Sequence, residues 1–126
     1  MTIREEYENT GGTDLKNFKE GKKIRIVSLD EIVKRFNLTH AALKVDCEGC
    51  EYDLILNASD EALHAFGQII IEYHYGYRNI LRALKESEFK VKYGWPKTIS
   101  NNTGGGEDSN TDIRYFGLIW ANNLNL

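Results

Sequence analysis

The sequence has little of several residue types that mark whole classes of protein. It contains one proline and two cysteines, and no apolar stretch approaches the run of about 18 residues that a membrane helix needs. Both cysteines lie in the CEGC tetrad at 47–50, too few and too local for the disulfide framework of a secreted miniprotein. The first 20 residues are polar and acidic, so we expect no signal peptide. These features predict a cytoplasmic protein that does not associate with a membrane.

An excess of positive charge is also missing. The 16 Lys and Arg residues are outnumbered by 19 Asp and Glu residues, and no basic stripe is interleaved with aromatic residues. A nucleic-acid partner is therefore not predicted. The 126 residues are 41% hydrophobic, which is enough for one compact core and excludes a disordered chain.

Two parts of the chain are poor in apolar residues. Residues 1–22 carry only widely spaced ones around a Gly-Gly pair, which predicts an irregular N-terminal arm. Residues 100–112 are polar and glycine-rich, which predicts a mobile surface loop. The rest of 23–126 is predicted to fold as one α/β domain.

The domain begins with a strand, a helix and a strand. Residues 23–27 (KIRIV) alternate and are β-branched, as is typical of a strand. A capping box at Ser28 and Glu31 then starts an amphipathic helix that runs to Phe36, and 41–45 is a second strand. This spacing predicts a βαβ unit.

The remaining elements complete a sheet with crossover helices. They are a helical stretch at 51–56, a short helix capped by Ser59, a strand at 68–74, a helix at 77–87, and strands at 89–93 and 113–121. The strand at 68–74 is apolar on both faces, so we expect it to be central, with helices on either side. The strand at 89–93 should lie near the sheet edge. It should pair antiparallel with 113–121, because their connection is too short for a helical crossover.

Polar side chains follow two of these strands. Asp46, Glu48 and Glu51 come after the strand at 41–45, while Glu72 and His74 end the strand at 68–74. Ligands bind beyond the carboxyl ends of parallel strands, so we expect all five to share one mouth if the two strands are neighbours.

These residue types allow more than one chemistry. Asp46 or Glu72 could deprotonate a substrate hydroxyl, since clustered carboxylates raise one another's pKa. Asp46, Glu72 and His74 could equally hold a divalent ion. Glu48 and Glu51 could instead do no more than stabilise the start of the following helix.

The CEGC tetrad allows a redox function. A Cys-x-x-Cys pair at a strand-to-helix turn is also found in thioredoxin-like proteins, where the helix lowers the pKa of a thiol. Against this, the intervening Glu48 raises the pKa, and the chain's one proline, Pro96, does not supply the cis-proline of such folds. A structural zinc site is not predicted either, because the three histidines are scattered over separate elements.

Three stretches carry a resemblance to a known family. SLDEI at 28–32, LKVDCEGCE at 43–51 and IIEYH at 70–74 are similar to the C-terminal half of the FkbM-type S-adenosylmethionine-dependent methyltransferases. The Lys-x-Asp-x-Glu-Gly-x-Glu string at 44–51 is the most specific part of this resemblance.

The resemblance implies a three-layer, Rossmann-like fold of the class I methyltransferase type. This chain would be a partial domain with the fourth to seventh strands, in a mainly parallel sheet that ends in an antiparallel hairpin. The implied reaction transfers a methyl group from S-adenosylmethionine to a hydroxyl oxygen of a small molecule or sugar. Asp46, Cys47 and Glu48 would lie at the cofactor beside the methyl group, with Glu72 and His74 on the acceptor side.

One part of the family pattern has no counterpart here. The glycine-rich loop after the first strand and the acidic residue after the second, which hold the cofactor, do not occur in the sequence. We therefore expect a half domain that is inactive unless it pairs as a homodimer or joins a cofactor-binding N-terminal half. The alternatives are a non-catalytic domain of this fold that serves binding or assembly, and the Cys-x-x-Cys redox module.

Overall fold

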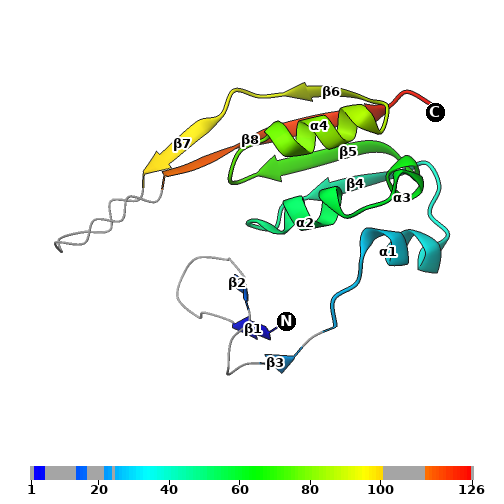
Figure 1. Ribbon diagram of the computed structural model, residues 1–126, viewed down its shortest axis with the longest axis horizontal. Coiled ribbons are helices and arrows are strands. Elements are labelled where there is room, and N and C mark those ends of the chain that lie inside the picture. Colours follow the sequence, from blue (N-terminus) through cyan, green and yellow to red (C-terminus); the bar gives the residue numbers. More distant parts are fainter. Residues whose placement is uncertain (1, 5–13, 17–21, 24, 101–112, 126) are drawn as a thin grey trace.

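The computed structural model describes residues 2–4, 14–16, 22–23, 25–100 and 113–125. Its main body is an open sheet with helices packed on it (Figure 1). The strands of this sheet are β4 (Ala41–Val45), β5 (Phe66–Tyr73), β6 (Phe89–Tyr93), β7 (Lys97–Ser100) and β8 (Ile113–Asn123). The helices are α1 (Leu29–Phe36), α2 (Cys50–Leu56), α3 (Asp60–His64) and α4 (Arg78–Glu86). The chain is therefore an α/β protein.

The sheet is mixed, with the order β4-β5-β8-β6 and with β7 paired to β8. β4 and β5 are parallel, whereas β8 is antiparallel to both of its neighbours, β5 and β6. Three strands, β4, β5 and β6, thus run in one direction, and the last strand runs back between two of them. The predicted antiparallel pair is confirmed, since Phe89 to Tyr93 pair with Asn123 to Ile119 and β7 continues the pairing along β8. The loop predicted at 100–112 lies outside the described residues except for Ser100.

The core lies on one face of the sheet. Ile69, Ile71 and Tyr73 of β5 are buried against a cluster to which α2, α3 and α4 contribute Ile55, Leu63, Ile80 and Leu84. On the other face, Ile70 is half-buried and Gln68 is exposed. The prediction that the strand at 68–74 is covered by helices on both faces is therefore wrong within the part of the chain that the structure describes. Ile70 instead stands in register with Trp120 of β8, so neighbouring strands provide its cover.

The first helix forms as the sequence predicts. Ser28 Oγ accepts a hydrogen bond from the backbone N–H of Glu31 at 3.1 Å, which satisfies one of the free donors at the start of α1. Asn37 ends the helix in a left-handed conformation, with φ of 48°. The Glu31 carboxylate pairs with Arg25 rather than with the backbone of Ser28, so only half of the expected capping box is made.

The strand predicted at 23–27 does not join the main sheet. Short strands β1 (Thr2–Arg4), β2 (Asp14–Lys16) and β3 (Lys22–Lys23) form a separate antiparallel sheet in the order β2-β1-β3. These strands lie where the sequence predicts an irregular arm. Residues 25–28 have no regular structure, so the predicted βαβ unit is wrong. The pattern of 23–27 suits a strand but cannot say which sheet it joins. Among the described strands, β4 consequently has one open edge.

A close contact joins the two central strands. Tyr73 of β5 pairs in register with Gly117 of β8, and a Cβ atom at position 117 would lie 2.5 Å from the Tyr73 hydroxyl. The strand needs glycine there because the ring fills the space of a side chain. The hydroxyl is buried and has no hydrogen-bond partner among the described residues, and burial raises the pKa of Tyr73.

This contact predicts an energetic coupling between the two positions. Gly117→Ala should lower the free energy of unfolding by about 1–3 kcal/mol, because the added methyl group overpacks the core. Tyr73→Phe should change it by less than about 1 kcal/mol, because the lost hydroxyl makes no hydrogen bond. In the double variant the alanine should cost less than it does alone, as measured by urea unfolding. Strictly additive effects would contradict the contact.

Candidate functional site

The carboxyl ends of β4 and β5 bring three predicted site residues together. Asp46 directly follows β4. Glu72 is the second-last residue of β5, and His74 directly follows that strand. One ligand atom of each lies within 4.8 Å of the others. The cause is topological, because two parallel neighbouring strands end at the same edge of a sheet.

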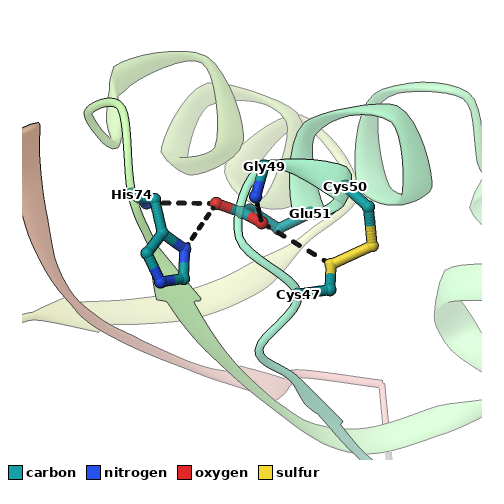
Figure 2. Close-up of a disulfide and its surroundings, with 5 residues drawn as sticks. All are labelled: Cys47, Gly49, Cys50, Glu51 and His74. Atoms are coloured by element: carbon teal, nitrogen blue, oxygen red, sulfur yellow. Dashed lines mark hydrogen bonds and ion pairs between the residues drawn. A yellow bond between two sulfur atoms is a disulfide. The ribbon is translucent and has the colours of Figure 1, made fainter. Parts of the chain in front are cut away.

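Glu51 lies behind these residues rather than among them. Its side chain is 0% exposed, and Figure 2 shows it between the turn before α2 and the end of β5. Oε1 accepts hydrogen bonds from the backbone N–H and from Nδ1 of His74, both at 3.0 Å. Oε2 accepts the backbone N–H of Gly49 at 2.8 Å. Both carboxylate oxygens are therefore satisfied inside the protein, which allows a charge-bearing group to be buried there.

These bonds fix the orientation of His74. The residue is 9% exposed, and an ionised Glu51 can only accept, so Nδ1 carries a hydrogen. In the neutral imidazole Nε2 then has the free lone pair. Oε1 of Glu72 lies 4.0 Å from Nε2, which is longer than a hydrogen bond.

The turn between β4 and α2 explains the position of Glu48. Glu48 and Gly49 are both left-handed, with φ of 55° and 119°. This conformation turns the Gly49 N–H toward Glu51 and leaves Glu48 exposed on the turn. Glycine is required at 49 for a second reason, because a Cβ atom there would lie 3.1 Å from the Tyr75 ring.

The two cysteines of this turn form a disulfide. Cys47 and Cys50 are joined across a separation of three residues, with their Cα atoms 5.5 Å apart. Cys47 Sγ lies 3.6 Å from Oε2 of Glu51 (Figure 2). A disulfide sulfur has no hydrogen to donate, so this contact becomes a hydrogen bond only when Cys47 is a thiol. Reduction of the disulfide would therefore add a hydrogen bond to the carboxylate that holds His74.

Asp46 has a cation beside it already. Lys44 Nζ lies 3.4 Å from Oδ2 of Asp46, and the two side chains are 69% and 41% exposed. An ion pair in such contact with water contributes little to stability and is easily displaced. Asp46 is therefore available to a ligand at this edge of the sheet.

The structure also shows a pocket that the sequence did not predict. A cavity of about 520 Å³ follows the end of β5. Its lining comprises Tyr52, Tyr75, Gly76, Tyr77, Arg78, Asn79, Pro96 and Tyr115. The available signal was the run of tyrosines at every second position from Tyr73 to Tyr77, but Tyr52 and Tyr115 come from distant parts of the chain.

Tyr52 connects α2 to one wall of this pocket. Its hydroxyl donates to the carbonyl oxygen of Gly76 at 2.5 Å and accepts the backbone N–H of Tyr75 at 2.8 Å. Burial raises the pKa of Tyr52, and the Tyr75 N–H opposes that shift. The phenol therefore stays protonated at neutral pH and can keep both hydrogen bonds.

Comparison with protein-family models, curated proteins and solved structures finds no match to this chain. None of the described helices is both long and apolar enough to cross a membrane. The function is therefore inferred from the residues of the site and their geometry.

The buried carboxylate predicts a large effect on stability. Glu51→Ala should lower the free energy of unfolding by about 3–5 kcal/mol, because three N–H groups lose their acceptor inside the protein. Asp53→Ala, which removes an exposed carboxylate from the same helix, should change it by less than about 0.5 kcal/mol. Urea unfolding measures both. Equal effects of the two substitutions would show that the hydrogen bonds of Glu51 do not stabilise the fold.

Proposed function

We propose that this chain is the C-terminal part of an S-adenosylmethionine-dependent methyltransferase of the FkbM type. It would transfer a methyl group to a hydroxyl oxygen of a small molecule or sugar. The observation that carries the proposal is a convergence of two motifs about twenty residues apart. The Asp46–Glu51 string and the Glu72–His74 string meet at one edge of the sheet, and Glu51 hydrogen-bonds His74 directly.

The directions of the strands support the finer fold assignment. Three parallel strands with a final antiparallel strand are what the resemblance implies for the later half of a three-layer, Rossmann-like domain. In this proposal the cofactor-binding half would pack on the face of the sheet and the edge of β4 that no described element covers. An unpaired edge strand recruits a partner chain, which here is either that N-terminal half or a second copy.

The site residues can be assigned roles in this reaction. Asp46 and Glu48, with Cys47, would lie near the positively charged sulfonium of the cofactor, which their charge stabilises. The acceptor oxygen forms a bond to the methyl carbon as the carbon–sulfur bond breaks, and the cofactor leaves as a neutral thioether. The proton of the hydroxyl passes to Nε2 of His74 or to the carboxylate of Glu72. Most of the rate comes from alignment, because the methyl donor is already activated.

The tyrosine pocket supports an acceptor with an apolar or sugar face. Its aromatic rings can stack on such a face, while Arg78 and Asn79 offer polar contacts. The pocket adjoins the site through the chain itself, because Tyr75 directly follows His74. We place the protein in the cytoplasm in this proposal, where the Cys47–Cys50 pair would be exposed to reducing conditions.

Calorimetric titration tests this proposal. The chain is titrated with S-adenosylmethionine and with S-adenosylhomocysteine, at concentrations where light scattering reports a dimer. We expect saturable binding, and we expect Asp46→Ala to weaken S-adenosylmethionine about tenfold or more, because the substitution removes a negative charge near the sulfonium. S-adenosylhomocysteine has no charge on sulfur and should be affected less. Asp53→Ala is the matched control.

The same titration distinguishes the first alternative. If neither ligand binds to the dimer, or if Asp46→Ala and Asp53→Ala behave alike, cofactor binding by this chain is contradicted. The chain would then be either a half domain that needs the N-terminal half to hold the cofactor, or a non-catalytic domain of the same fold that serves binding or assembly.

The disulfide favours dithiol redox exchange as a second candidate function. Cys47 and Cys50 are already joined, and Cys50 is the first residue of α2. Under the methyltransferase proposal, glutathione at neutral pH should reduce the pair to thiols that alkylate fully, yet the reduced chain should not reduce the disulfides of insulin. Mass spectrometry measures the first result and insulin turbidity the second. Turnover of insulin that is lost in Cys50→Ser would establish the redox function instead.

A further inference from the structure

The three residues at the sheet edge, Asp46, Glu72 and His74, combine two carboxylates with an imidazole. One ligand atom of each residue lies within 4.8 Å of the others. His74 is about nine-tenths buried. Among the described residues its Nε2 makes no hydrogen bond, and it points toward Glu72 with 4.0 Å between the atoms. A ring nitrogen with a free lone pair beside two carboxylates can serve as a third ligand to a cation.

The other nitrogen of the ring is held in the way that metal-binding histidines are held. Histidine ligands usually donate their second ring N–H to a carboxylate or carbonyl, which fixes the tautomer and raises the basicity of the ligating nitrogen. Here the fully buried Glu51 accepts from Nδ1 and also from the backbone N–H of the same residue. Glu51 therefore sets both the tautomer and the direction of Nε2.

We propose that Asp46, Glu72 and His74 bind a divalent metal ion through one carboxylate oxygen each and Nε2, with Glu51 as the positioning residue. Three protein ligands leave further coordination positions for water or for an oxygen atom of a bound molecule. If the proposed methyl transfer is correct, the hydroxyl of the acceptor would occupy one of these positions. Its proton would then pass to the other carboxylate oxygen of Glu72, because the ion occupies the lone pair of Nε2. The metal site itself does not depend on that reaction.

The spacing fits such an ion after a movement of the exposed side chains. Ligand atoms about 2.2 Å from a common metal, at angles of about 90–110°, lie about 3.1–3.6 Å from one another, so the observed limit of 4.8 Å requires a contraction of about 1 Å. Asp46 and Glu72 can make it, because their side chains are 41% and 35% exposed. Lys44 would yield its place beside Asp46, since its ammonium is mostly in water.

The ligand set also selects the kind of ion. Two carboxylates with one imidazole suit Mn²⁺, whereas Mg²⁺ prefers oxygen ligands alone. Zn²⁺ also binds thiolates, so it would report on reduced Cys47 and Cys50 as well as on this site. Mn²⁺ is therefore the better probe.

The test measures Mn²⁺ binding to the full chain by electron paramagnetic resonance, after removal of metals with a chelator and without S-adenosylmethionine. We expect one ion per chain, bound at least tenfold more tightly than Mg²⁺ in competition. Asp46→Asn and Glu72→Gln should each weaken binding at least tenfold, and these half-exposed positions should not disturb the fold. Glu51→Gln should weaken it by about 10–100-fold through His74, provided that circular dichroism shows a folded chain.

Asp53→Asn is the matched control and should leave Mn²⁺ binding unchanged. No saturable binding at millimolar Mn²⁺, or binding that Asp46→Asn and Glu72→Gln both leave intact, would overturn the site. Mn²⁺ binding without binding of S-adenosylmethionine would support the metal site while contradicting cofactor binding by this chain. The two proposals can therefore fail separately.

Discussion

The buried carboxylate of Glu51 is the constraint on which this end of the molecule depends. Burial of a carboxylate is costly unless both of its oxygens accept hydrogen bonds inside the protein. Here the donors come from two different parts of the fold. The left-handed turn before α2 supplies one, and the residue after β5 supplies the others. Glu51 therefore fixes the distance between helix and strand and orients His74 at the same time.

The alternation of β5 explains how a core and a polar site share one strand. Residues of one parity, such as Ile71 and Tyr73, point to the helices and are buried. Glu72 has the other parity and points to the uncovered face, which α2 and α4 do not reach (Figure 1). The site begins where the strand ends, because His74 leaves the pleat and turns toward Glu51 instead of continuing the alternation.

Local signals in the sequence predicted most of the elements. The serines that cap α1 and α3, the apolar periodicity of α4 and the alternation of β6 depend only on neighbouring residues. Two features depend on contacts with distant segments: that residues 23–27 do not join the main sheet, and that helices cover one face of β5. The alternation of apolar residues carries no information on such contacts. The meeting of Asp46, Glu72 and His74 followed from the parallel pairing of two strands. The burial of Glu51 did not, because an acidic residue after a glycine turn reads equally well as an exposed helix start.

The order of the strands has a consequence for how the chain folds. β8 separates β5 from β6, so two strands made earlier have no partner on that side until residues 113–123 leave the ribosome. The hydrophobic cluster around Ile71 and Ile119 can close only then. During synthesis, the nascent chain therefore exposes apolar strand edges of the kind that are prone to aggregate. Its folding rate is set by contacts far apart in sequence, and the helices alone cannot speed it.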